Sequence, residues 1–141
     1  MWTIEQLCYF AGILDGEGSI AIEKMSPCNA RQYHYFTPRL CIINTNNELI
    51  EWLIKNFGGS RNTRTKVKGR RECYRWHVFG KELENILRAV VPYILIKRQL
   101  AMLVLEFRET VGKTGSRVTE EIRNQREQLY LRSRSMNKIG E

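Results

Sequence analysis

The chain has 141 residues and a mass of 16.6 kDa, which corresponds to one domain of ordinary size. Hydrophobic residues make up 43% of it and charged residues 27%, so the composition is globular and excludes a wholly disordered chain. Lys and Arg outnumber Asp and Glu by 23 to 15, and the resulting net charge of +8 favours a polyanionic partner.

The residues argue against a membrane or secreted protein. The longest apolar run, residues 89–96, is interrupted by Pro92 and is too short to cross a bilayer. The first residues lack a basic segment, and Glu5 and Asp15 interrupt the apolar stretch, so we expect no signal peptide. The cysteines are Cys8, Cys28, Cys41 and Cys73. Their scattered spacing argues against a zinc site and favours reduced thiols in an intracellular compartment, either the cytoplasm or nucleoid or an organelle matrix.

A helix is predicted at the start of the chain. Thr3 and Gln6 have the spacing of a capping box, and glycines such as Gly16 and Gly18 are residues at which helices end. The apolar residues recur at the spacing of one helix face: Leu7, Phe10, Ala11 and Leu14. We therefore expect a helix that begins at Thr3 and ends at Gly16 or Gly18.

Two strands and a second helix are predicted next. Residues 19–24 and 33–43 are rich in β-branched and aromatic residues, and a turn over 26–31 separates them. Alternation in the second strand places Phe36, Leu40 and Ile42 on one face and Tyr35, Thr37 and Arg39 on the other. The helix is expected to begin within residues 44–47 and to end at Gly58 and Gly59.

The rest of the chain predicts a second pair of strands and three further helices. Residues 60–67 and 72–79 are the strands, followed by a helix over 81–91 that Pro92 ends and a longer helix over 93–110. Thr119 is expected to cap a polar final helix with little apolar surface, frayed from Ser133 onward. The order predicts one α+β domain over residues 1–132, with a four-stranded sheet and a frayed tail at 133–141.

The second pair of strands is strongly basic. Residues 61–77 contain seven Lys and Arg residues and one acid, Glu72. A two-stranded ribbon fits the major groove of DNA, where arginine can donate two hydrogen bonds to guanine. The alternative is a solvated hairpin that binds nothing, and Tyr74 and Trp76 are assigned to the core. The predicted DNA contacts are Glu23, Tyr35, Thr37, Arg39, Arg61, Thr63, Arg64, Lys66, Lys68, Arg70, Arg75 and His77.

The end of the first helix carries two carboxylates among glycines. Asp15 is the only aspartate in the chain, and Glu17 lies between Gly16 and Gly18. Negative charge at a helix C-terminus is unfavourable, whereas a divalent cation would favour both the carboxylates and the free carbonyls there. On the residues alone, a solvent-exposed turn and a metal site explain this segment equally well.

Residues 10–18, with the sequence FAGILDGEG, resemble the nine-residue signature of the LAGLIDADG homing endonucleases. The resemblance extends over about residues 3–110, through the order of the elements, the glycines after Phe57, the strand at 74–76 and the segment 92–97. It implies an αββαββα core with a four-stranded antiparallel sheet that binds DNA, extended here by an extra C-terminal helix.

The resemblance also implies roles for residues near the signature. Glu17 falls on the position of the direct metal ligand and Gly16 offers its carbonyl to the same ion, with Mg²⁺ supporting cleavage and Ca²⁺ supporting binding alone. Asp15 falls on a position that is more often structural. Asn44 falls where Gln often holds waters near the scissile phosphates, although Asn is one methylene shorter. Lys97 matches a basic residue near the catalytic centre, and its alternative is a lysine that caps a surface turn.

One signature in the chain predicts a homodimer. Cys8, Gly12 and Gly16 lie four residues apart on one face of the first helix, where small residues let two helices approach closely. Dimerisation there would place two Glu17 carboxylates side by side, an arrangement that needs cations and suits two-metal phosphodiester hydrolysis.

These inferences predict an intron-encoded, site-specific endonuclease that cleaves a long pseudo-palindromic DNA target. Two alternatives share the fold: an RNA-binding maturase, which would add intron RNA as a partner, and a DNA-binding regulator that has lost its acidic ligands. Retention of Gly16, Glu17 and Lys97 argues against the regulator. The maturase stays open, because a basic surface does not distinguish A-form RNA from duplex DNA.

Overall fold

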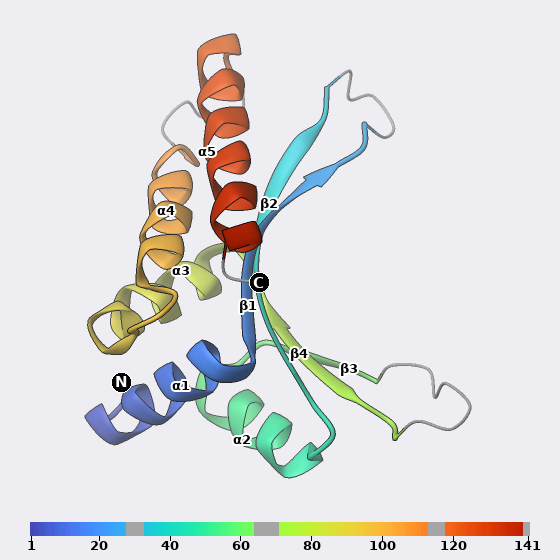
Figure 1. Ribbon diagram of the computed structural model, residues 1–141, viewed down its shortest axis with the longest axis vertical. Helices are drawn as coiled ribbons and strands as arrows, with labels where there is room; N and C mark the ends of the chain where they lie inside the picture. The colour runs from blue at the N-terminus through green and yellow to red at the C-terminus, as the bar shows by residue number, and fades with distance from the viewer. Residues whose placement is uncertain (28–32, 64–70, 113–117, 140–141) are drawn as a thin grey trace.

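The computed structural model describes residues 1–27, 33–63, 71–112 and 118–139. Within them, the elements follow in the predicted order (Figure 1): α1 (Ile4–Glu17), β1 (Gly18–Met25), β2 (Tyr35–Asn44), α2 (Asn47–Phe57), β3 (Ser60–Thr63), β4 (Tyr74–Val78), α3 (Gly80–Val90), the 3₁₀ turn η1 (Val91–Tyr93), α4 (Arg98–Glu109) and α5 (Glu120–Ile139). None of the described helices is both long enough and apolar enough to cross a membrane. The predicted α+β architecture is confirmed.

The strands form one antiparallel sheet in the order β1-β2-β4-β3. All the helices lie on one side of it, and the β1–β2 and β3–β4 hairpins splay apart on the other side, where the sheet is open and concave (Figure 1). The side chains that face the helices form the core, and Ile20, Leu40, Ile42 and Trp76 are fully buried there. The open face is therefore the only face of the sheet, among the described residues, that a large ligand can reach.

Helix α1 begins and ends as the sequence predicts. The Thr3 hydroxyl accepts a hydrogen bond from the Gln6 amide N–H, and the Gln6 side-chain oxygen accepts one from the Thr3 N–H. The helix ends because Gly18 has extended backbone and donates its N–H to the Leu14 carbonyl. A Cβ at Gly18 would lie only 2.5 Å from the Leu14 side chain, so this close approach requires glycine.

The predicted assignment of Trp76 to the core is confirmed. Its ring is completely buried and its indole N–H donates to the Gly58 carbonyl over 2.8 Å. Gly59 has a φ of +78°, and a Cβ there would meet the same indole at 2.6 Å. The two glycines that end α2 therefore also allow the chain to enter β3 against the Trp76 ring.

The prediction of one long helix over residues 93–110 is wrong for residues 93–97. Helix α4 begins only at Arg98, and residues 94–97 form an irregular turn after η1. The cause is a contact distant in sequence: the Asp15 carboxylate accepts the backbone N–H groups of Leu95, Ile96 and Lys97. The strand predicted over 72–79 is shorter, at Tyr74–Val78. The strand predicted over 60–67 corresponds to Ser60–Thr63, and its remaining residues, 64–67, lie outside the described residues.

The C-terminal segment expected to be frayed is the end of helix α5. The Thr119 hydroxyl accepts from the Ile122 N–H as predicted, and the helix then continues to Ile139. Ser133, where fraying was expected to begin, is 1% exposed. Leu129 is buried and Tyr130 and Met136 pack against the core, so one face of this polar helix is held on the rest of the domain.

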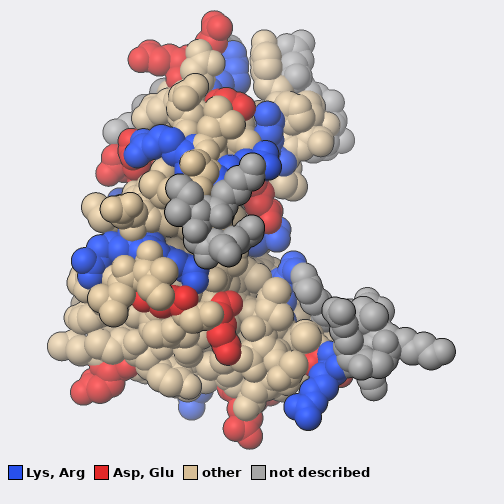
Figure 2. All heavy atoms as spheres, in the orientation of Figure 1, with Lys and Arg blue, Asp and Glu red and all other residues tan. Residues whose placement is uncertain are grey.

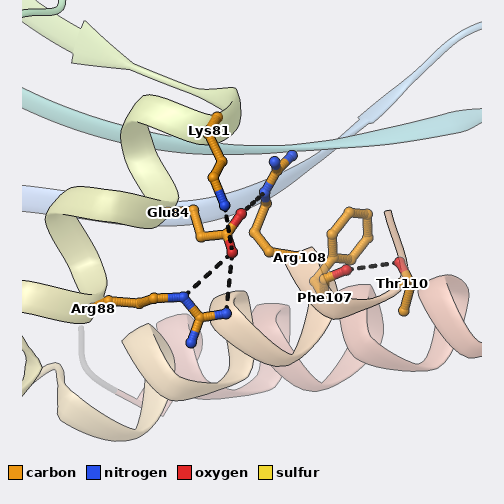
Figure 3. A network of polar contacts seen from close by, with 6 residues as sticks. All are labelled: Lys81, Glu84, Arg88, Phe107, Arg108 and Thr110. Carbon is orange, nitrogen blue, oxygen red and sulfur yellow. Dashed lines mark hydrogen bonds and ion pairs between the residues drawn. The ribbon is translucent and has the colours of Figure 1, made fainter. Parts of the chain in front are cut away.

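A buried carboxylate joins helices α3 and α4 (Figure 3). Glu84 is 8% exposed and lies within 3.0 Å of the Arg88 guanidinium, 3.3 Å of Arg108 and 3.5 Å of the Lys81 ammonium. Burial acts to raise the pKa of Glu84, but the hydrogen bonds from Arg88 and Arg108 and the charge of Lys81 outweigh it and hold the pKa below its usual value. Glu84 therefore stabilises the fold as a carboxylate.

Glu84→Gln is expected to lower the free energy of unfolding at neutral pH by about 2–3 kcal/mol, because it leaves buried Arg108 without its anion. Since the folded pKa is lowered, the contribution is complete above the unfolded pKa of about 4.3 and is lost as the pH falls through the folded value. Chemical denaturation of both proteins between neutral and strongly acidic pH measures this difference. Glu121→Gln, at an exposed site on α5, is the control, and an equal loss at every pH would contradict the assignment.

Candidate active site and nucleic-acid interface

Glu17 is the last residue of α1, and its side chain is exposed. Its carboxylate accepts a 2.6 Å hydrogen bond from the side-chain amide of Asn44, the last residue of β2. The Asn44 side-chain oxygen in turn accepts the Asn46 N–H over 2.7 Å, which fixes the direction of the amide. The structure thus brings together Glu17 and Asn44, the two residues that the resemblance had placed near the scissile phosphates.

Asp15 and Lys97 hold the end of α1 against the turn before α4. The Asp15 carboxylate accepts three backbone N–H groups, over 2.8 Å from Leu95, 3.2 Å from Ile96 and 3.1 Å from Lys97. The Lys97 ammonium donates to the carbonyls of Leu14, over 3.0 Å, and Asp15, over 2.8 Å. Lys97 therefore satisfies carbonyls at the negative end of α1, a contact distinct from the surface turn considered as its alternative.

The donors around Glu17 have the chemistry that a hard divalent cation prefers. Glu17 provides an exposed carboxylate and Gly16 a backbone carbonyl at the helix end, and such oxygen ligands suit Mg²⁺ and Ca²⁺. No group of three or more His, Cys, Asp or Glu side chains gathers around a common point among the described residues. The described residues of one chain therefore gather no cluster of such ligands around Glu17.

The outward face of the sheet carries polar and charged side chains in register. Arg75 and His77 of β4 lie opposite Ile43 and Cys41 of β2, facing away from the helices. The alternation predicted for β2 is confirmed, since its outward residues pair with outward residues of β1. The predicted DNA contacts found on this face are Glu23, Tyr35, Thr37, Arg39, Arg75 and His77.

Two of the predicted DNA contacts do not share this face of the sheet. Arg61 and Thr63 pair with Trp76 and Tyr74, which face the helices, so they lie on the helix side of the sheet. The Arg61 guanidinium donates to the Asn47 side chain of α2 over 2.8 Å. The predicted contacts Arg64, Lys66, Lys68 and Arg70 lie outside the described residues.

Two outward residues were missed by the sequence prediction. Ser60 and Asn62 of β3 lie beside His77 and Arg75, respectively, on the open face. The composition of residues 60–67 predicts a strand but not its register, and a one-residue change in register exchanges the two faces of a strand. A register argument from the strongly apolar Trp76 would have found them, since the residue opposite Trp76 must share its face.

The centre of the open face is positively charged. Arg39 is paired with Glu23 over 3.0 Å, and His77 lies within the field of both Arg39 and Arg75. Burial, with the charges of Arg39 and Arg75, lowers the pKa of His77, so its ring is neutral at neutral pH. In the space-filling view, Lys and Arg side chains border the notch between the two hairpins together with acidic side chains (Figure 2).

The predicted dimer face of α1 is exposed. Cys8, Gly12 and Gly16 are all accessible, and a Cβ added at either glycine would meet nothing within 4 Å of its own chain. Beside this face, the turn held by Asp15 presents Leu95 and Ile96, which are 81% and 77% exposed. Two glycines that the monomer does not require thus lie next to two apolar side chains that it leaves in solvent.

Comparison with known proteins gives a fold but no sequence relative: no family model matches the chain, and no curated protein matches its sequence. The homing endonuclease I-CvuI, solved with its target in the presence of calcium, superposes with a TM-score of 0.79 at 19% identity, over 94% of this chain and 82% of that one. The archaeal intron-encoded homing endonuclease I-Vdi141I, complexed with DNA, gives 0.77 at 16% identity, over 94% and 84%.

A third structure, the LAGLIDADG homing endonuclease I-LtrWI bound to target DNA, gives a TM-score of 0.70 at 19% identity. That alignment covers 86% of this chain but only 42% of I-LtrWI, so the present chain corresponds to less than half of that protein. The signature resembled by residues 10–18 lies on α1, next to the sheet whose open face carries Arg39 and Arg75. Element order, sheet topology and these superpositions together show that the protein has the fold of the LAGLIDADG homing endonucleases.

Proposed function

We propose that the protein is a site-specific endonuclease that binds duplex DNA on the open face of its sheet and cleaves both strands as a Mg²⁺-dependent homodimer. The observation that carries the proposal is the position of Glu17: it is exposed at the end of α1, held by Asn44, and directly precedes the edge strand β1 of that face. A carboxylate oriented beside a basic, DNA-sized concavity is the arrangement that phosphodiester hydrolysis needs.

In this proposal, Glu17 and the Gly16 carbonyl hold Mg²⁺. Once bound, the ion supplies Lewis-acid stabilisation of the charge that develops on the scissile phosphate and lowers the pKa of a coordinated water. Asn44 keeps the Glu17 carboxylate oriented through its 2.6 Å hydrogen bond. Lys97 adds positive charge close to the same helix end, and its contacts with the carbonyls of Leu14 and Asp15 support a positioning role beside the catalytic one inferred from the resemblance.

The open face would read sequence through a small set of side chains. Arg39 and Arg75 have guanidinium groups at its centre, and neutral His77 can donate and accept hydrogen bonds. Strand β1, with eight residues, spans roughly 26 Å at ~3.3 Å per residue, or about eight base pairs. Two subunits with a central cleavage region therefore predict a pseudo-palindromic target of roughly twenty base pairs.

Gly12→Leu is expected to abolish dimerisation without unfolding the monomer. Gly12 is exposed and a Cβ there meets nothing within 4 Å of its own chain, so the monomer should accept the new side chain. A partner helix packed against α1 would collide with it. Sedimentation with and without target DNA measures the assembly, and circular dichroism checks the fold. Asn124→Leu adds the same apolar side chain at an exposed site in the first turns of α5, the end of that helix that lies away from α1 in Figure 1, and should leave assembly unchanged. An intact dimer of the Gly12→Leu protein would contradict the proposed interface.

The function is tested by incubation of the purified protein with a randomised duplex DNA library, followed by sequencing of cut ends. We expect cleavage at one family of related sites with Mg²⁺, and retention of the same DNA without cleavage when Ca²⁺ replaces it. Sequence-specific retention without cleavage in either ion would favour the regulator. A protein that ignores duplex DNA but promotes splicing of an intron RNA would be a maturase.

A further inference from the structure

The backbone around Glu17 is not held by local conformational preference. Its neighbours Gly16 and Gly18 are glycines, which restrict the backbone less than any other residue. On the N-terminal side the chain is fixed by the contacts of Asp15 and Lys97 described above. On the C-terminal side of Glu17, strand β1 pairs with β2 from Gly18 onward, but only along one of its two edges. A contact on the outer edge of β1 would therefore hold the strand after Glu17 from its second side.

Such a contact, a second anchor, comes from the far end of the sequence. Strand β1 lies at the edge of the sheet, so carbonyls on its outer edge have no partner strand. The Asn137 side-chain amide, in the last turns of α5, donates to the Ile20 carbonyl over 3.3 Å. Ile20 is only three residues beyond Glu17, so this contact fixes the strand directly after the proposed metal ligand.

The same end of α5 closes one side of a hollow next to the site. The hollow has a volume of about 730 Å³, and Gly16, Gly18 and Ser19 line it on one side while Met136 and Asn137 line it on the other. The residues before and after Glu17 in the sequence therefore line the same hollow as the end of α5. Movement of that end would change the surroundings of the helix end and of the start of β1 together.

Helix α5 is itself firmly attached to the β1–β2 hairpin, so it can serve as a support. Glu127 forms an ion pair with Lys24 of β1 over 3.3 Å, and the Tyr130 ring packs on Phe36 of β2 with centroids 5.2 Å apart. Buried Ser133 donates its hydroxyl to the Tyr130 carbonyl one turn earlier. The contacts run along the helix toward Asn137, and α5 lies beside β1 and β2 in Figure 1.

We infer that the C-terminal end of α5 is a positioning element for the proposed active site, with Asn137 as the residue that fixes β1 behind Glu17. The inference rests on the proposed endonuclease function, because it assigns Asn137 a role through Glu17. Asn137 does not touch the reacting atoms in this assignment. It restricts the backbone that carries the metal ligand, as partners of metal ligands do in other sites.

The test compares Asn137→Ala with Asn124→Ala, the same change at an exposed position on the same helix. Single-turnover cleavage by Asn137→Ala should be slower by about tenfold, with a higher Mg²⁺ requirement and unchanged DNA affinity in Ca²⁺. Hydrogen exchange measured by mass spectrometry should rise in the peptide covering residues 15–22. Asn124→Ala should match the parent in each measurement, and Asn137→Gln, which keeps the donor, should restore part of the rate.

Three outcomes separate the possibilities. Equal cleavage, Mg²⁺ requirement and hydrogen exchange in Asn137→Ala and Asn124→Ala would overturn the positioning role. So would a parallel loss of DNA affinity in Ca²⁺ by Asn137→Ala, which would make the end of α5 a DNA contact or a general fold determinant. A parental protein that cleaves no DNA, together with faster exchange in Asn137→Ala, would keep the anchor and overturn the endonuclease instead.

Discussion

Glu17→Gln is expected to reduce cleavage in Mg²⁺ by at least about 100-fold, because the amide keeps the size of the side chain but is not an anionic ligand. Binding of the target in Ca²⁺ or without metal should persist, since the open face of the sheet is unchanged. The Gln side-chain oxygen can still accept from the Asn44 amide, so the local structure should also persist. Cleavage rates, DNA affinity and thermal unfolding measure these effects.

The thermal stability of Glu17→Gln tests whether two Glu17 carboxylates lie close together in a dimer. Two Glu17 carboxylates pressed together at a dimer axis repel each other without a cation, so Glu17→Gln should unfold at an equal or higher temperature when metal is absent. Glu5→Gln, an exposed charge removal in the first turn of the same helix, is the matched control for the loss of one carboxylate. Cleavage by Glu17→Gln at the parental rate would rule out the proposed mechanism.

Asp15→Asn is expected to lower stability and to leave some cleavage, the reverse of the effects expected for Glu17→Gln. The carboxylate accepts three backbone N–H groups, whereas the amide has one oxygen and presents its own N–H groups to the same donors. We expect a loss of about 2–3 kcal/mol in the free energy of unfolding, since bonds to a charged acceptor are each strong and unpaired donors are costly. Some cleavage should remain at temperatures where the variant is folded.

Urea denaturation of Asp15→Asn and Glu17→Gln side by side provides the comparison, because both variants remove one negative charge within two residues of each other. The first should lose stability and keep some activity, and the second should lose activity and keep stability. If Asp15→Asn is as stable as the parent, the three N–H bonds do not hold the turn before α4. If it abolishes cleavage without a change in stability, Asp15 acts directly at the site.

The sequence by itself determined the elements whose signals are local. The Thr3–Gln6 capping box fixed the start of α1, the glycines fixed the ends of α1 and α2, and alternation fixed which side chains of β2 and β4 face outward. The resemblance carried by residues 10–18 and by the order of the elements implied roles for Glu17 and Asn44, and in the structure the Asn44 amide donates to the Glu17 carboxylate over 2.6 Å. Such features depend on a few adjacent residues, and their conformational preferences survive in any fold.

Tertiary structure decided the features that depend on partners distant in the chain. Residues 94–97 have apolar helical character, but the Asp15 carboxylate takes their N–H groups and holds them in a turn. The register of β3 against β4 placed Arg61 on the helix side of the sheet, and Ser60 and Asn62 on its open face. The end of α5 is polar in sequence and was expected to fray. In the structure, Met136 packs against the core and the Asn137 amide donates to the Ile20 carbonyl of β1. These contacts hold the helix end because the folded sheet provides the surface and the edge carbonyl for them. Contacts between residues some eighty to more than a hundred positions apart leave no periodic signal in either segment, so only the folded chain could reveal them.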